Sequence, residues 1–336
     1  MTGTRSVFLV LSPKSLPYAS ICLETLFSNS LEALNIKLIT DSEEDKQDLL
    51  HALASVANPH DHQWQIFSKP EADDRAAEQF RGLPHLQAFR NGHPCWRKIT
   101  DPLLFAAKSE EMIILDPDLY FPNKFTFEST PEQTLLLMWQ PPSCLQPLET
   151  VQAAFAASVK LAHHVDIGVA QWRKPVDLTW LDWLLGALGG ETIPHSMFVE
   201  AIVWSALAMK LGGAYLDTQR WHCWYNDHWK RVLIKRGFSI TRLLEMENMK
   251  QVKCFHATGP CKWWLKEALE SGRLNGGKTL DKPSKLSALT EFTPGRYQLE
   301  QNIKDLLRKI GYYSLINPAW GELEKSRRIA SSGKNV

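Results

Sequence analysis

The sequence lacks a long hydrophobic run near its start. Residues 7–11 are apolar, but Ser12-Pro13-Lys14 follows at once. Five residues are too few for the core of a signal peptide and far too few to span a bilayer. We therefore expect a cytoplasmic protein without a transmembrane segment.

An excess of charge of either sign is also missing. The 38 Lys and Arg residues nearly cancel the 37 Asp and Glu residues, which argues against a nucleic-acid partner. With 44% hydrophobic and 22% charged residues among 336, the composition is typical of a soluble globular protein. The length suits one large α/β domain or two small ones.

The cysteines lack the spacings of disulfide scaffolds and of zinc sites. None of the six forms a CxxC pair, so we expect reduced thiols. Cys254 and Cys261 flank His256, but a four-ligand metal cluster would need a second pair of ligands nearby in the sequence. The sequence shows no such pair.

Glycine is missing where two nucleotide-binding classes need it. No GxGxxG motif follows the first apolar run, which argues against a dinucleotide-binding Rossmann unit. A nucleotidyltransferase is expected to carry a Gly-rich, basic phosphate loop at the same place. Residues 11–17 hold no glycine, so this class stays as an alternative that explains less.

What the sequence has is an alternation of strands and helices. Apolar periodicity predicts strands at 7–11 and 36–40, each followed by a helix, at 18–34 and at 43–57. This order is typical of an α/β protein with a mainly parallel, twisted sheet, right-handed crossovers and flanking helices.

The rest of the chain is less regular. Residues 58–95 show no clear period and predict a long irregular connection with short elements, including a strand at 63–67. Gly168 lies within a strand-like run, 163–172, which suggests that a ligand or another backbone approaches closely. The other expected elements are helices at 96–108, 149–162, 178–189, 197–211 and 297–310, and strands at 112–115, 134–139, 214–216 and 252–255.

Two carboxylates follow the apolar strand 112–115. Residues i and i+2 of an extended chain point to the same side, so Asp116 and Asp118 can face one ligand. Pro117 between them indicates that the strand has ended. Paired carboxylates at a strand end suit a hard divalent cation with phosphates and water around it. Taken alone, Asp-Pro-Asp favours an ordinary surface turn over a cation site.

A second group of polar residues follows the strand 252–255. His256 offers a metal ligand, Gly259 lets backbone amides approach a phosphate, and Lys262 can neutralise charge. The plainer interpretations are a hydrogen-bonded histidine at a strand end and a lysine on a helix surface.

Together these segments resemble the GT-A glycosyltransferases of the glycogenin-like family 8. Asp116-Pro117-Asp118 looks like the DxD motif, and residues 256–264 are similar to the HxxGxxKPW motif. Arg97-Lys98-Ile99 looks like the Thr-Lys-Leu element ahead of the DxD. Asp166-Ile167-Gly168-Val169 lies where the family has Asn-x-Gly-Val, and Glu200 falls near its Asp-Gln position. The likeness extends over residues 7–266.

The resemblance implies a GT-A fold and a metal-dependent glycosyltransferase. The sugar would move from a nucleotide-diphosphate donor, with UDP-sugar favoured, to an acceptor that the sequence does not identify, with retention at the anomeric carbon. The implied ligands of Mn²⁺ or Mg²⁺ are Asp116, Asp118 and His256. The implied donor-binding residues are Leu11, Lys98, Asp116, Asp118, Gly259 and Lys262, and the implied catalytic residues are Asp166, Glu200 and Lys262.

The sequence also departs from the family pattern. Trp263 stands in place of proline, Asp166 in place of asparagine, and Glu200 in place of aspartate without the glutamine that follows it. A non-catalytic nucleotide-sugar-binding protein of the same fold would be indicated by loss of a metal ligand. All three candidate ligands are present.

Two regions keep open interpretations. We expect a glycosyltransferase domain at residues 1–282 and a helical, basic tail at 283–336. For this tail a plain solvated state is favoured over contact with an anionic membrane surface. The Trp-rich stretch 219–250 is either an acceptor platform or core packing.

Overall fold

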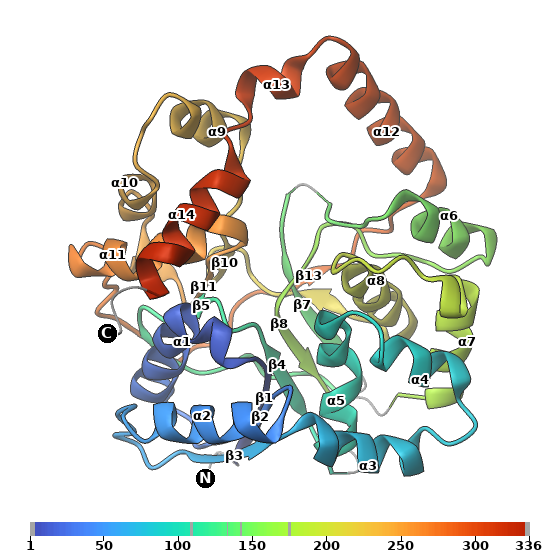
Figure 1. The fold of residues 1–336 in the computed structure, drawn as a ribbon, viewed down its shortest axis with the longest axis horizontal. Helices are drawn as coiled ribbons and strands as arrows, with labels where there is room; N and C mark the ends of the chain where they lie inside the picture. Colours follow the sequence, from blue (N-terminus) through green and yellow to red (C-terminus); the bar gives the residue numbers. More distant parts are fainter. Residues whose placement is uncertain (1–3, 108–109, 133, 142, 174–175, 333–336) are drawn as a thin grey trace.

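The computed structural model describes residues 4–332 except 108–109, 133, 142 and 174–175. Its centre is an eight-stranded sheet (Figure 1). The strands lie in the spatial order β13 (Ser287–Ala288), β9 (Ala214–Tyr215), β7 (Leu135–Trp139), β8 (Val165–Trp172), β4 (Met112–Leu115), β1 (Arg5–Val10), β2 (Leu34–Ile39) and β3 (Gln63–Phe67). Four of the seven strand pairs are parallel. The predicted α/β class with a mainly parallel sheet is confirmed.

Helices cover both faces of the sheet because its strands alternate apolar residues between them. Val7 and Leu9 of β1 belong to one core and Phe8 to the other. On the side of Val7 lie α1 (Leu16–Asn29) and α2 (Glu43–Leu53). The helices on the side of Phe8 are α3 (Lys69–Gln79), α4 (Pro84–Arg90), α5 (Arg97–Phe105), α6 (Leu148–Ala156), α7 (Leu178–Ala187) and α8 (Val199–Leu211).

A smaller sheet adjoins the carboxyl end of β4. Its strands lie in the order β10 (Trp221–Cys223), β11 (Cys254–His256) and β5 (Leu119–Tyr120). A third core packs around it. The helical elements beside this sheet are α9 (His228–Lys235), α10 (Ile240–Glu245), the 3-10 turns η4 (Met249–Gln251) and η5 (Gly259–Trp264), and α11 (Leu265–Glu270). A two-stranded pair, β6 (Lys124–Phe125) with β12 (Thr279–Leu280), completes this part.

From Pro294 onward the described chain is mainly helical. In Figure 1, α12 (Pro294–Lys309) and α13 (Tyr312–Ile316) form an arch from the side of α6 to that of α9, and α14 (Trp320–Ser332) then packs on η5. Since β13 pairs with β9 of the central sheet, the chain beyond residue 283 also supplies an edge strand. The boundary between 282 and 283 stays a prediction. No helix of the described residues is both long and apolar enough to cross a membrane.

The structure corrects several sequence predictions. Residues 58–95 contain α3 and α4 as well as the predicted strand. The predicted helix 18–34 ends at Asn29, because Leu34 pairs with Arg5 and begins β2. The predicted helix 149–162 ends at Ala156, shortly before Ser158 takes a positive φ of 58°. Two further predicted helices are too long as well. The helix 43–57 ends at Leu53, and the helix 96–108 ends at Phe105 because Ala106 takes an extended backbone, while residue 108 itself lies outside the described residues.

Candidate metal and donor site

Asp116 and Asp118 lie between the two sheets. Just after β4, the Asp116 N–H still donates a hydrogen bond to strand β8, to the Gly168 carbonyl at 2.9 Å. Two residues on, the Asp118 carbonyl accepts from the Ala257 N–H at 3.0 Å, beside the end of β11. Both residues are buried. The backbone therefore holds this segment as a bridge between β8 and β11 rather than as a surface turn.

His256 brings three of the predicted carboxylates together. Its Nε2 lies 3.2 Å from Asp118 Oδ1 and 3.7 Å from Asp116 Oδ2. Its Nδ1 lies 2.8 Å from Asp166 Oδ2, at the start of β8. A carboxylate on one ring nitrogen fixes the imidazole orientation and leaves the other nitrogen for a metal. Asp166 thus aims Nε2 at the two carboxylates that follow β4.

Gly168 makes room for this arrangement. A Cβ placed on Gly168 would lie 2.4 Å from His256 Nδ1, well inside van der Waals contact. A group does approach this glycine closely, but it is the imidazole side chain of His256 and not the predicted ligand or backbone.

Two lysines that are far apart in the sequence contact the carboxylates. Lys98, in the first turn of α5, places Nζ 2.7 Å from Asp116 Oδ1 and 3.0 Å from Glu200 Oε1. Lys262, in η5, places Nζ 3.1 Å from Asp118 Oδ2. Glu200 belongs to the first turn of α8 and also accepts from Trp204 Nε1, one turn on, at 3.3 Å.

Burial and charge act against each other on these groups. Burial alone raises the pKa of Asp118, but Lys262 and His256 outweigh it and hold this pKa well below the usual range. Burial lowers the pKa of His256, yet Asp166 and Asp118 raise it well above 6.5. For Glu200 burial prevails over Lys98 and raises the pKa to about 8. The site therefore keeps Asp118 ionised beside two cationic groups, whereas the buried Glu200 carboxyl takes up a proton more readily.

The donor set fits a divalent cation. Ligand atoms of Asp116, Asp118 and His256 all lie within 4.8 Å of one another. Two carboxylates and an imidazole suit Mn²⁺ or Mg²⁺ with phosphate oxygens and water. Asp166, Cys223 and His256 form a second such group. The first group is the better site for these hard cations, because it offers two carboxylates beside His256 whereas the second offers one carboxylate and a soft thiol.

Other sequence-predicted residues lie near this cluster without adding a charged side chain to it. Leu11 follows β1, and its N–H donates to the Ile39 carbonyl at 3.0 Å. Gly259 opens η5 with φ 60°, a value that favours glycine. Cys223 was not predicted, and its spacing from Asp166 and His256 carries no signal. The Glu200–Trp204 contact has the i, i+4 spacing that a helix predicts.

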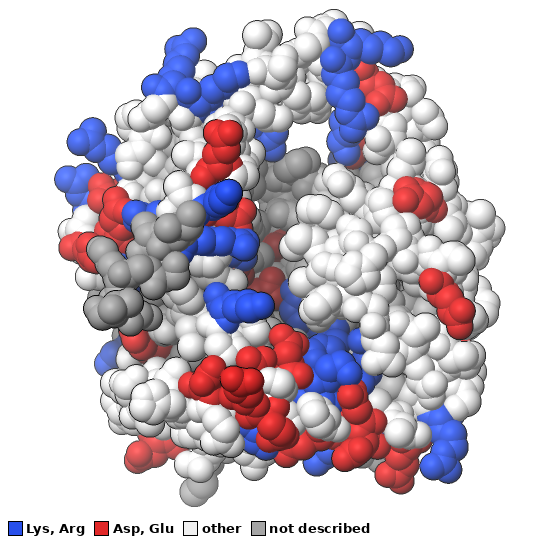
Figure 2. Space-filling view, in the orientation of Figure 1, with Lys and Arg blue, Asp and Glu red and all other residues white. Residues whose placement is uncertain are grey.

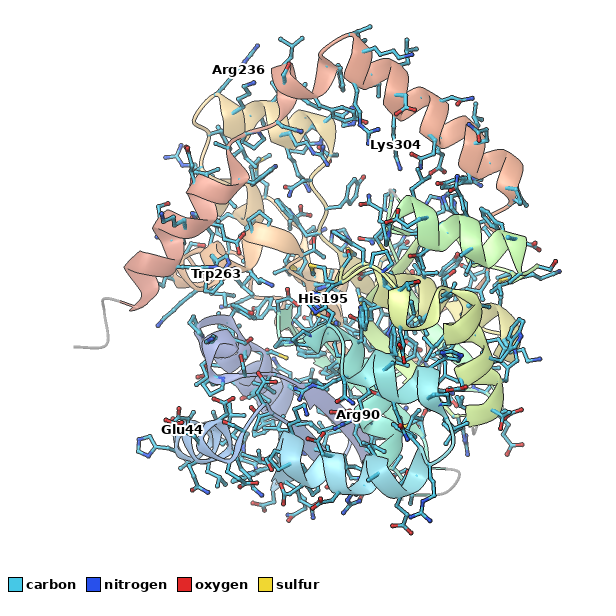
Figure 3. All side chains as sticks on the ribbon, turned by 45° about the vertical axis from the view of Figure 1, so that its right-hand side comes forward. Glu44, Arg90, His195, Arg236, Trp263 and Lys304 are labelled. Carbon is cyan, nitrogen blue, oxygen red and sulfur yellow. The ribbon has the colours of Figure 1, made fainter. Side chains whose placement is uncertain are left out.

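Trp263, the departure from the family's proline, has a packing role. Its ring packs edge-on against the ring of Tyr18 in α1, with the two ring centroids 5.1 Å apart. Its Nε1 donates to Glu324 of α14 at 3.2 Å. In Figure 3 Trp263 lies between α14 and α1, while His195 lies near the middle of the molecule. The tryptophan thus joins the segment that carries Lys262 to the C-terminal helix.

Figure 2 shows a hollow in the middle of this face, beneath the arch of α12 and α13. Acidic and basic atoms are visible within the hollow and along its lower rim.

Comparisons with known proteins give similarity in structure only. No family model matches the chain, and no curated protein matches its sequence. Similar solved structures include mouse xyloside xylosyltransferase 1, with a TM-score of 0.47, 11% identity, and coverage of 76% of this chain and 97% of that one. An active-site mutant of LgtC has a TM-score of 0.46, 12% identity, and coverage of 81% and 95%. The glycosyltransferase GlyE of Streptococcus pneumoniae has a TM-score of 0.41, 14% identity, and coverage of 82% and 61%.

Xyloside xylosyltransferase 1 and GlyE are glycosyltransferases by name, and LgtC is a galactosyltransferase. This is the class of enzyme that the sequence motifs predict. TM-scores below 0.5 at this identity are too low to carry an argument about function, which therefore rests on the side chains described above.

Proposed function

We propose that the chain is a metal-dependent glycosyltransferase of the GT-A type. It would move a sugar from a nucleotide-diphosphate donor, with UDP-sugar favoured, to the hydroxyl of an acceptor. One observation carries the proposal. Asp116, Asp118 and His256 converge on one point, Asp166 fixes the imidazole, and Lys98 and Lys262 lie on either side.

The two lysines suit a diphosphate leaving group. In the transfer the bond between the sugar C1 and the diphosphate oxygen breaks, and its electron pair leaves with the diphosphate. The acceptor oxygen bonds to C1, and its proton passes to the departing phosphate. Lys262 is only partly buried and is placed to stabilise the charge that develops there. A bound Mn²⁺ or Mg²⁺ would supply further charge stabilisation as a Lewis acid.

The remaining predicted residues would contact the sugar, the nucleotide or the phosphates of the donor. Lys98 would orient the donor, since it already spans Asp116 and Glu200. Asp166 and Glu200 would hydrogen-bond the donor sugar or stabilise an oxocarbenium-like centre, with Asp166 also positioning His256. Leu11 and Gly259 would approach the nucleotide and its phosphates through their backbone. Retention at the anomeric carbon rests on the family resemblance alone.

Calorimetry with UDP, with and without Mn²⁺ and then with GDP and CMP, tests the proposal. We expect Mn²⁺-dependent binding of UDP in the wild type and its loss in Asp118→Ala, with thermal melting showing that both proteins are folded. Absence of binding of any of the three nucleotides to folded wild-type protein would refute the proposal. Equal binding by Asp118→Ala would refute the site.

A further inference from the structure

A pocket of about 530 Å³ adjoins the candidate site. It opens between the end of β7, strand β10 and the segment around η4. Its volume lies within the range of about 300–1,000 Å³ that is common for small-ligand sites. The lining residues are Trp139, Pro141, Thr218, Gln219, His222, Cys223, Tyr225, Glu247, Asn248, Met249, Gln251 and Val252. Most of the lining comes from the stretch 219–250, for which the sequence left an acceptor platform and core packing open.

The lining combines aromatic rings with neutral polar groups. Trp139 and Tyr225 are both partly exposed, so each presents a ring to the pocket as well as to the protein. Thr218, Gln219, Asn248 and Gln251 are exposed beside them and offer hydroxyl and amide groups. Aromatic faces pack against the C–H faces of sugar rings, while hydroxyls and amides bond to sugar hydroxyls.

The charged groups at the pocket are already paired. Glu247 lies 3.0 Å from Lys230 Nζ and 3.6 Å from His222 Nε2. Lys230 in turn lies over the Trp224 ring at 4.6 Å. Among the described residues that line the pocket, none is a lysine or an arginine. Arg220 lies next to the lining and donates to Gln251 Oε1 at 2.8 Å. The lining itself therefore presents neutral hydroxyl and amide groups, which suit an uncharged polyhydroxyl ligand better than a nucleotide.

The pocket and the candidate site share a wall. Cys223 lines the pocket, and its Sγ lies within 4.8 Å of ligand atoms of Asp166 and His256. Trp139 pairs with Val165 across β7 and β8, and its neighbour Met138 pairs with Asp166. A ligand held on Trp139 and Tyr225 is thus separated by a single layer of residues from the proposed site of transfer.

We propose that this pocket binds a neutral saccharide, and that this saccharide is the acceptor or a distal part of it. The proposal that the pocket binds a saccharide rests on the lining residues alone. Its assignment as acceptor rests on the proposed function.

An array of neutral and anionic oligosaccharides, probed with the labelled full-length protein, tests this inference. We expect binding to at least one neutral glycan, weakened at least tenfold in Trp139→Ala and in Tyr225→Ala. Trp183→Ala is the matched control, because Trp183 is 50% exposed on α7, outside the pocket. Gln219→Trp adds a test by filling the pocket from its rim, and it should weaken binding without removing a buried side chain.

Each outcome bears on the inference. Binding of no glycan, binding confined to anionic glycans, or equal binding by Tyr225→Ala and the wild type would overturn it. Calorimetry with UDP and Mn²⁺ on the same proteins separates the two proposals. Loss of glycan binding with UDP binding intact is expected for the pocket variants. A wild type that binds glycans but no nucleotide would keep the saccharide site and remove its assignment as acceptor.

Discussion

Two of the buried clusters of charged side chains in the described part of the chain are built differently. Glu128, 2% exposed, accepts from Lys253 Nζ at 2.8 Å, from Trp221 Nε1 at 2.9 Å and from Ser284 Oγ at 2.6 Å. Its other oxygen accepts from the Ser284 N–H at 2.8 Å. Lys253 also donates to a backbone carbonyl at 3.0 Å. Every charge in this cluster meets a donor or acceptor of the protein.

The candidate site instead turns carboxylates toward one another. Asp116 and Asp118 share His256, and Asp116 and Glu200 share Lys98. Lys262 and His256 offset the charge of Asp118, and the raised pKa of Glu200 lowers the negative charge that Lys98 has to balance. The contrast shows that buried charge alone does not indicate function. Convergence of acidic groups on one point does, whereas a closed network such as that of Glu128 holds the fold together.

Breaking the closed network should have the largest effect on stability. Glu128→Gln leaves the fully buried Lys253 without its counter-charge, which costs about 3–5 kcal/mol. We expect a large fall in the denaturant midpoint and unchanged Mn²⁺ affinity per folded molecule. A midpoint close to that of the wild type would show that Glu128 is not structural.

Replacing Lys262 in η5 should lower the rate of the proposed reaction rather than the stability of the fold. Lys262→Met takes away charge stabilisation of the leaving group, which corresponds to roughly 10²–10³-fold in rate, or about 2.7–4 kcal/mol. The measurement is the rate of UDP release from a bound UDP-sugar, together with thermal melting. Lys266→Met, an exposed lysine of α11, is the control and should change neither. A similar loss of rate in both variants would contradict the role of Lys262.

A methyl group at Gly168 should weaken metal binding at the candidate site. Gly168→Ala forces the His256 ring to move, since the new Cβ would lie 2.4 Å from Nδ1. Disturbing a residue that orients a metal ligand typically lowers metal affinity by roughly 10–100-fold. Gly295→Ala is the control, because nothing lies within 4 Å of its Cβ. Unchanged Mn²⁺ affinity in Gly168→Ala would show that His256 is not a ligand.

The smallest effect is a dependence of stability on pH. Burial raises the pKa of Glu128, but hydrogen bonds from Lys253, Ser284 and Trp221 outweigh it and hold the pKa below 4.5. A carboxyl with a lowered pKa in the folded state contributes stability that is complete above pH 4.5 and is lost as the pH falls through its folded value. The difference in stability between the wild type and Glu128→Gln should therefore shrink below pH 4.5. A constant difference from pH 7 to pH 3 would contradict this.

Much of the fold follows from local patterns in the sequence. The apolar run 112–115 located β4 to the residue, because a buried strand needs continuous apolar side chains. Helix α3 was missed because its residues are mostly polar, although Ser68 and Glu71 form a capping box that signals its start. Helix ends were less predictable, since strand pairing at Leu34 overrides a helical spacing.

The candidate site was only partly predictable. Motifs in the sequence indicated the carboxylates and His256, but they did not predict which side chains contact one another. Lys98 meets Asp116 only because α5 folds back along the sheet. Asp166 contacts the imidazole rather than an open cavity because β8 runs antiparallel to β4. Such tertiary contacts depend on strand order, which local sequence does not specify.

Titration with Mn²⁺ followed by electron paramagnetic resonance tests the central claim most directly. The two clusters are compared through the wild type, Asp118→Asn and Glu128→Gln. We predict one Mn²⁺ site in the wild type and in folded Glu128→Gln, and its loss in Asp118→Asn. Equal Mn²⁺ binding by Asp118→Asn and the wild type would contradict the account.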